Sequence, residues 1–141
     1  MPHLLRDDDE GICILTLNRP EIRNAIDDEI MRLLAEETAR LASDESLRAV
    51  VLTGTRGDAF CAGGDLKWLQ SFETAEAGEA MSRRMQEILA DLANLPVPVI
   101  CALNGYALGG GTEIALSCDI RVMEESAYLS FRHARIGLMP A

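Results

Sequence analysis

Two apolar segments, each followed by a glycine turn and a helical sequence, limit what this chain can fold into. RAVVLTG (48–54) and PVPVICALN (96–104) are short, nearly continuous apolar runs, which is typical of buried strands in a parallel sheet. The loops after them reach the glycine clusters of FCAGGDL (60–66) and ALGGGTE (107–113) before the chain turns helical. Strands that alternate with helices in this way predict an α/β fold built from ββα units.

The remaining segments fit the same alternation. The acidic stretch DDDEG is expected to be the turn of a hairpin between strands 3–5 and 12–17, and NRPEIRNAI (18–26) is expected to be a loop. Helical spacing of apolar residues predicts helices from Asp27 onward, over 73–94 and over 110–117, with further strands over 119–123 and at 128–129. No linker, low-complexity tract or internal repeat is visible, so we expect one domain over residues 1–141.

Composition excludes several classes of protein. The formal net charge of −10 argues against a nucleic-acid-binding or anionic-membrane-binding surface. No apolar run approaches the roughly 20 residues that span a bilayer, and MPHLLRDDDE lacks the apolar region of a signal peptide. The four cysteines are widely spaced without a CxxC pair, so we expect core thiols rather than zinc or disulfides, in a reducing cytoplasm.

The glycine clusters have two explanations. Glycine lets a helix end pack closely against a strand, or it leaves backbone N–H groups open to bind a negatively charged atom. Two such N–H groups that converge on one point form an oxyanion hole, and a helix starting near Gly110 adds the positive end of its dipole. The chain has no GxxxxGK[ST], GxGxxG or GxSxG motif, so a P-loop, a dinucleotide fingerprint and a nucleophile elbow are not expected.

Three segments carry a resemblance to a known family. NRPEIRNAI (18–26), AFCAGGDLKWL (59–69) and NGYALGGGTEIALSCDIRV (104–122) resemble the successive signatures of the enoyl-CoA hydratase/isomerase (crotonase) superfamily, in family order. The resemblance implies a crotonase-like spiral of ββα units that acts on acyl-CoA thioesters. It implies no separate cofactor, because coenzyme A is part of the substrate. It also implies that the N–H groups of Gly64 and Gly110 hold the thioester oxygen as an enolate forms.

The resemblance also implies which residues contact coenzyme A. These positions are Arg23, Ala25, Ala62, Gly63, Gly64, Asp65, Lys67 and Gly110. Coenzyme A carries several negative charges and the chain is acidic, so local cations must receive it. Arg23, Arg56 and Lys67 are candidates, and each could equally be a solvated surface charge.

Glu113 is the expected acid/base residue. It lies three residues after Gly110 in a mostly apolar helix, so one helical turn brings its carboxylate towards the oxyanion site. The alternative is a glutamate solvated at a helix N-terminus. Hydratases of the family carry a second Glu, after a proline, where this chain has Arg132 and His133 in FRHARIGLMP. Histidine titrates in a suitable range to replace that acid, or it is a side chain on an exposed turn.

The leading prediction is an enoyl-CoA hydratase, with Gly64, Gly110, Glu113 and His133 as its catalytic groups. Isomerisation or dehydration on the same scaffold remains open, as does a non-catalytic acyl-CoA-binding or assembly subunit. A thioester hydrolase with Cys61 as nucleophile is a further alternative, although no motif places a base beside it. Family members run to about twice this length, so we expect either a fragment of a longer protein or a truncated natural chain. In both cases the C-terminal helices that cover the active site would be absent from these 141 residues. Those helices make the contacts of a homotrimer or a dimer of trimers, and their absence would expose apolar surface.

Overall fold

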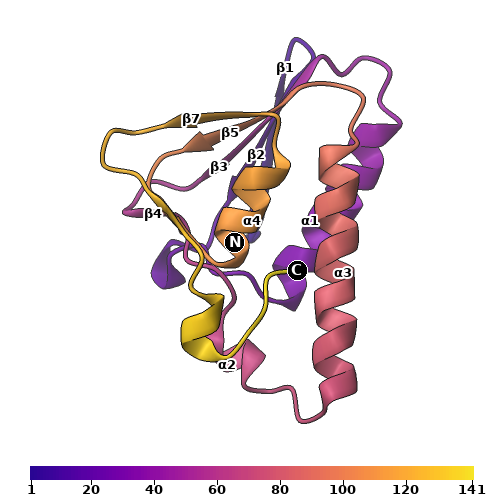
Figure 1. The fold of residues 1–141 in the computed structure, drawn as a ribbon. Helices are drawn as coiled ribbons and strands as arrows, with labels where there is room; N and C mark the ends of the chain where they lie inside the picture. Colours follow the sequence, from indigo (N-terminus) through magenta and orange to yellow (C-terminus); the bar gives the residue numbers. More distant parts are fainter.

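The computed structural model describes all residues 1–141, and its main element is a five-stranded sheet (Figure 1). The strands follow in the order β1-β2-β3-β5-β7. Their bounds are Leu4–Asp9, Ile12–Leu17, Ala49–Gly54, Val99–Leu103 and Ile120–Met123. The first pair is antiparallel and the other three pairs are parallel. The prediction that the apolar segments 48–54 and 96–104 are neighbouring strands is therefore confirmed, because β3 pairs directly with β5.

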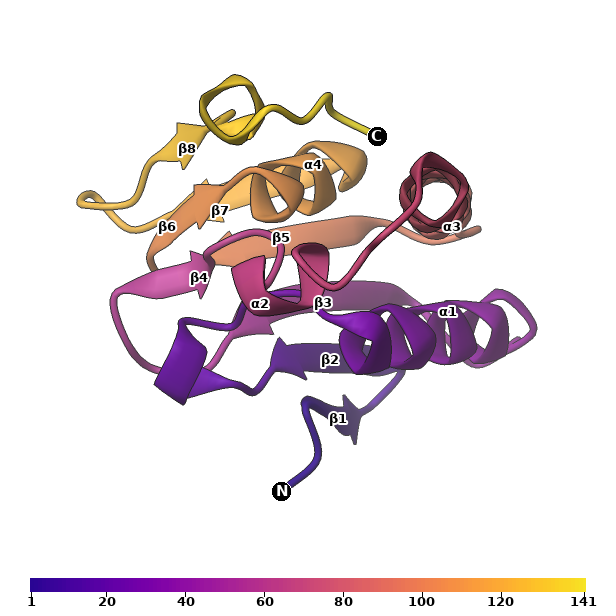
Figure 2. The ribbon, with the colours of Figure 1, turned by 90° about the horizontal axis from the view of Figure 1, so that it is seen from below.

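Three short strands form a second sheet in the order β4-β6-β8 (Figure 2). They span Ala59–Cys61, Tyr106–Leu108 and Leu129–Ser130. Each follows a strand of the large sheet and precedes a helix, so β3–β4, β5–β6 and β7–β8 begin three successive ββα units. The units repeat in structure although no repeat is visible in the sequence. The strands β4 and β6 were not predicted, because a three-residue strand is too short to show a period of two.

The hairpin turn differs from its prediction. It consists of Glu10 and Gly11 alone, both with positive φ, as in the type I′ turns that suit two-residue hairpins. The acidic residues 7–9 expected in the turn belong to β1 and pair with β2 up to Asp9 opposite Ile12. Arg6 offsets part of their charge through an ion pair with Asp8, and it also pairs with Glu37 of α1.

Two long helices lie side by side on one flank of the large sheet (Figures 1 and 2). Helix α1 spans Asp28–Ala42 and begins at Asp27, whose side chain accepts a hydrogen bond from the Ile30 N–H. Helix α3 spans Ala75–Ala93 and is capped in the same way by Thr74. The shorter helical segments are α2 (Leu66–Leu69), α4 (Gly110–Ser117) and the 3-10 turns η1 (Pro20–Ile22) and η2 (His133–Ile136).

The core lies between these helices and one face of the sheet. Alternate residues of β2, β3 and β5 are fully buried against apolar side chains of α1 and α3. The intervening residues of β3 and β5 are partly buried, and none is exposed. At the sheet edge all four residues of β7 are exposed, with Ile120 and Val122 each more than half accessible.

The four cysteines are free and buried, as expected of core thiols. No helix is long and apolar enough to cross a membrane.

Candidate active site

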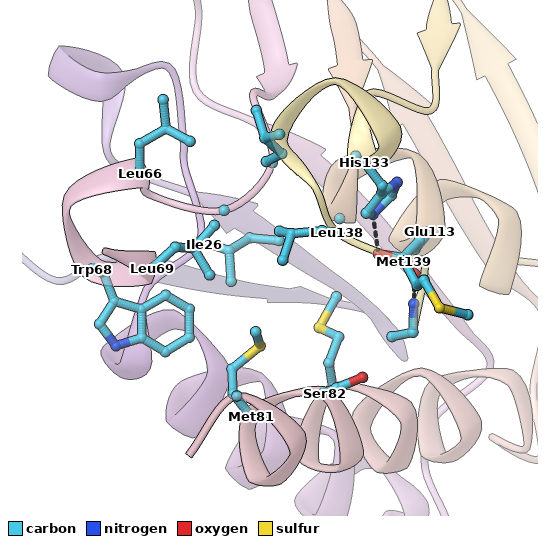
Figure 3. A pocket seen from close by; sticks show the side chains of 18 of the residues that line it. Ile26, Leu66, Trp68, Leu69, Met81, Ser82, Glu113, His133, Leu138 and Met139 are labelled. Atoms are coloured by element: carbon cyan, nitrogen blue, oxygen red, sulfur yellow. Dashed lines mark hydrogen bonds and ion pairs between the residues drawn. The ribbon is translucent and has the colours of Figure 1, made fainter. Parts of the chain in front are cut away.

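A largely apolar cavity of about 550 Å³ lies between α2, α3, the start of α4 and the C-terminal segment (Figure 3). Trp68 and Leu69 come from α2, and Met81 comes from α3. Leu138 and Met139 close it from the C-terminal segment. Its polar part includes residues of the two glycine turns together with Glu113, Arg132 and His133.

The two glycine turns meet at this cavity. A Cβ on Gly63 (φ +91°) would lie 2.8 Å from the carbonyl oxygen of Leu108, and one on Gly111 would lie 2.5 Å from that of Cys61. Close packing therefore explains those two glycines. Packing is also close at Gly64, where a Cβ would lie 2.7 Å from Leu69 Cδ1, and at Gly110, where it would lie 3.1 Å from Ile26 Cδ1. The N–H groups of Gly64 and Gly110 donate no hydrogen bond within the chain. Because both residues line the cavity, their free donors are available to an atom bound there.

Backbone pairing with Ile26 fixes the first turn. The Ile26 N–H donates to the Gly63 carbonyl oxygen at 2.7 Å, and the Asp65 N–H donates to the Ile26 carbonyl oxygen at 2.7 Å. These two bonds bracket Gly64, which pairs with Ile26 as an isolated parallel bridge. The Gly64 N–H is thus held in a defined place although it belongs to a loop.

Arg19 reinforces this arrangement and was missed in the sequence. Its Nη1 forms an ion pair with Asp27 at 2.9 Å and donates to the Ala25 carbonyl oxygen, and its Nη2 lies 3.5 Å from the Asp65 carboxylate. Asp27 begins α1 and Asp65 begins α2, so one guanidinium ties both helix starts to the loop. The only signal was the composition of NRPEIRNAI, which looks like an ordinary polar loop.

Glu113 and His133 form a buried pair at the polar end of the cavity (Figure 3). His133 Nε2 lies 3.1 Å from Glu113 Oε2, and only 9% and 8% of Glu113 and His133 are exposed. Both exposed alternatives considered from the sequence are therefore wrong. The other Glu113 oxygen, Oε1, accepts from the Ala141 N–H. The other ring nitrogen of His133, Nδ1, is buried and has no hydrogen-bond partner in the chain.

Four of the eight residues expected to contact coenzyme A line the cavity, and Gly110 is one of them. Ala62, Gly63 and Gly64 line it, and the Ala62 N–H donates to the Arg23 carbonyl oxygen at 3.0 Å. The side chains of Arg23 and Lys67 are exposed beside this loop, whereas Ala25 is buried and does not line the cavity. Arg56 is exposed and does not line the cavity. The side chain of Asp65 accepts hydrogen bonds at the start of α2 and so caps that helix.

Cys61 is poorly suited to act as a nucleophile. Its side chain is fully buried and does not line the cavity. Burial raises the pKa of the Cys61 thiol to about 12, so the reactive thiolate is scarce at neutral pH. The structure therefore disfavours the thioester hydrolase alternative.

Comparison with known proteins identifies the family. The sequence matches the family described as "Enoyl-CoA hydratase/isomerase" over residues 7–141. The chain belongs to this family, and the predicted crotonase-like α/β fold is confirmed.

Individual relatives span several reactions. The chain is 36% identical over 136 residues to the mitochondrial methylglutaconyl-CoA hydratase of Mus musculus, covering 96% of the chain and 43% of that protein. It is 38% identical over 143 residues to the 1,2-epoxyphenylacetyl-CoA isomerase of Escherichia coli K12, covering 99% of the chain and 54% of that protein. The crystal structure of an enoyl-CoA hydratase from Mycobacterium smegmatis superposes with a TM-score of 0.93 at 37% identity, over 98% of the chain and 54% of that structure. The chain thus spans about half the length of the relatives it matches.

Proposed function

We propose that the protein acts on acyl-CoA thioesters and adds water reversibly to a 2-enoyl-CoA. The observation that carries this proposal is the content of one cavity: two unpaired backbone N–H groups and a buried carboxylate–imidazole pair. Negative charge that develops on a thioester oxygen needs donors already in place. Proton transfer to and from water and carbon needs titratable groups within reach of the same substrate.

Each group has a role in the proposal. The N–H groups of Gly64 and Gly110 bind the thioester oxygen and stabilise the enolate. Glu113 exchanges the proton of the attacking water or of the α-carbon, and His133 is the second group in place of the family's second glutamate. The apolar wall of Trp68, Leu69 and Met81 receives the acyl chain, and Arg23 and Lys67 are the nearest exposed cations for the phosphates of coenzyme A. No further cofactor is proposed.

Isomerisation of an acyl-CoA is the second candidate. Moving a proton between two carbons requires one group that accepts the proton and returns it. The hydrogen-bonded Glu113–His133 pair can act as that group. The similarity to the Escherichia coli isomerase supports this alternative. A non-catalytic acyl-CoA-binding subunit has less support, because binding alone does not need a buried acid next to an imidazole.

The proposed hydration is tested with Glu113→Gln in the full-length protein. The amide keeps the shape of the carboxylate but cannot exchange a proton, so turnover of crotonyl-CoA should fall by about 10²–10⁴-fold while acyl-CoA binding persists. Turnover is followed by the loss of enoyl-CoA absorbance, and binding is followed by calorimetry. Glu87→Gln, at an exposed position of α3 away from the cavity, is the matched control.

The outcomes separate the candidates. Equal turnover by wild type and Glu113→Gln would remove Glu113 from the mechanism. Binding without turnover in both proteins would favour the non-catalytic subunit.

We also propose a homotrimer or a dimer of trimers, located in the cytoplasm. The exposed apolar residues of β7 support association with further protein surface. Light scattering of the full-length protein tests the assembly, and a monomer would contradict it.

A further inference from the structure

Arg132 is a cation in the wall of the cavity that no acid of the chain neutralises. It immediately precedes His133 and lines the same cavity. Its Nε–H is inaccessible to solvent and has no hydrogen-bond partner. The only other arginine with a buried, unpartnered Nε is Arg19, and both terminal nitrogens of Arg19 are held in ion pairs. Arg132 is half-buried, and its terminal nitrogens form no ion pair with the chain.

The acids near Arg132 do not account for it. Glu113 uses one oxygen for His133 and the other for the Ala141 N–H. Glu79, the other acid that lines the cavity, is exposed on α3 and forms no ion pair. A buried guanidinium N–H without a hydrogen-bond partner is unfavourable, and an acceptor bound in the cavity would supply one. The missing partner is therefore expected to come with the ligand.

The chemistry of the guanidinium and its place in the cavity restrict that partner. A guanidinium offers a planar fork of N–H donors that fits a carboxylate or a phosphate through two parallel hydrogen bonds. An acyl-CoA carries phosphates on its coenzyme A part and can carry a carboxylate at the far end of its acyl part. Arg132 adjoins His133 in sequence, and the wall beside it is formed by apolar Ile136, Leu138 and Met139. This end of the cavity suits the acyl part, whereas exposed Arg23 and Lys67 suit a strongly hydrated phosphate.

We propose that the cavity selects acyl-CoA substrates whose acyl chain ends in a carboxylate, with Arg132 as the counter-ion. This inference rests on the proposed acyl-CoA activity and names the substrate class of the same site. Arg132 is a specificity residue in this proposal: it contacts the far end of the acyl group and takes no part in proton transfer.

The test compares two 2-enoyl-CoA substrates of equal chain length, one ending in a carboxylate and the other in a methyl group. The wild-type protein should prefer the carboxylate-ended substrate by about tenfold or more in kcat/KM. Arg132→Leu should lower this preference by about 10- to 100-fold. Arg132→Gln, which keeps a polar side chain, serves as a second variant if the leucine variant does not fold. Arg135→Leu is the matched control, because Arg135 lies in the same 3-10 turn, is exposed and does not line the cavity; it should keep the wild-type preference.

Three results would overturn the assignment. The first is a wild-type protein that prefers the methyl-ended substrate or does not discriminate. The second is a decrease in kcat/KM of the Arg132 variants that is equal for both substrates. The third is a weaker affinity of those variants for free coenzyme A, which would mean that Arg132 binds a phosphate.

The test also separates this inference from the proposed activity. If the wild-type protein turns over neither substrate, the proposed hydration fails, and calorimetry with the two saturated acyl-CoA analogues decides the inference. Tighter binding of the carboxylate-ended analogue that is lost in the Arg132 variants would still support it. Equal affinities for the two analogues would refute it.

Discussion

Gly63 packs so closely on Leu108 that a Cβ at Gly63 would lie 2.8 Å from the Leu108 carbonyl oxygen. The same Cβ would lie 3.6 Å from the Gly110 backbone nitrogen. The loop after β4 and the loop after β6 therefore meet at the cavity, although 47 positions separate Gly63 from Gly110 in the sequence. Gly64 and Gly110, whose N–H groups are unpaired within the chain, both line this cavity.

Replacing Gly110 with proline removes one proposed oxyanion donor without removing a hydrogen bond of the fold. Proline is accepted at the first position of a helix, and the Gly110 N–H has no partner in the chain. We expect kcat for an enoyl-CoA to fall by about 10²–10³-fold, in line with the loss of one donor. Gly110→Ala is the matched control, because it keeps the N–H and adds a Cβ only 3.1 Å from a flexible Ile26 side-chain atom. Equal losses in both variants would show that crowding, not the missing donor, causes the effect.

Replacing His133 with alanine should lower turnover by a smaller factor than Glu113→Gln does. Loss of the imidazole frees Glu113 from its 3.1 Å hydrogen bond but leaves the carboxylate in place. We expect a decrease of about 10- to 100-fold, at the lower end of acid–base contributions. The measurement is steady-state kinetics over a range of pH, since a group that transfers protons changes the profile and a purely structural group does not. An unchanged pH profile and rate would exclude His133 from the reaction.

Replacing Arg19 with methionine should destabilise the fold more than the loss of a surface ion pair. Its side chain is 11% exposed, and its removal leaves both Asp27 and Asp65 without their counter-ion. We expect a loss of about 2–4 kcal/mol in the free energy of unfolding, measured by urea denaturation. Arg32→Met is the control, because its pairs with Glu29 and Glu36 are about half exposed and should contribute much less to the free energy of unfolding. Equal decreases in the free energy of unfolding for both variants would mean that Arg19 does not hold the starts of α1 and α2 together.

Ionisation of Cys61 should destabilise the protein at high pH. Burial raises the pKa of the Cys61 thiol to about 12 from 9.0, so between these values the unfolded chain releases a proton that the folded chain retains. Stability is therefore unaffected by this group below pH 9 and should decrease above it, by up to about 1.4 kcal/mol per pH unit. Cys61→Ser should reduce the slope without abolishing it, because the pKa of Cys13 is also raised, to about 11. The measurement is the free energy of unfolding from urea denaturation between pH 8 and 11. If this free energy decreases equally steeply with pH in Cys61→Ser and in the wild type, ionisation of Cys61 does not contribute.

Sequence patterns predicted the long elements well and the short ones poorly. Helices α1 and α3 show several turns of apolar spacing, and β3 and β5 stand out as apolar runs. The pattern of apolar residues alone therefore predicts where these four elements lie in the sequence. The strands β4 and β6 have three residues each, and only their pairing with each other reveals them. The acidic residues of β1 were assigned to a turn because a charged run rarely forms a strand. The ion pairs of Arg6 with Asp8 and Glu37 reduce the repulsion between acidic side chains at this strand.

The candidate site was predictable where chemistry depends on local sequence. Glu113 follows Gly110 by one helical turn, and the glycine clusters stand beside their strands. The His133 pair could not be predicted, because its partner lies 20 positions away and meets it only when η2 folds over the start of α4. The guanidinium of Arg19 was missed for the same reason: its partners Asp27 and Asp65 belong to two different helix starts.

A crystal structure of the full-length protein with a bound, non-reactive acyl-CoA tests the central claim most directly. The claim is that the N–H groups of Gly64 and Gly110 form one oxyanion site beside Glu113. The account predicts that the thioester oxygen lies within about 3.2 Å of both backbone nitrogens, with the β-carbon facing the Glu113 carboxylate. A thioester oxygen bound to neither nitrogen, or an acyl chain outside the cavity of Trp68, Leu69 and Met81, would contradict it.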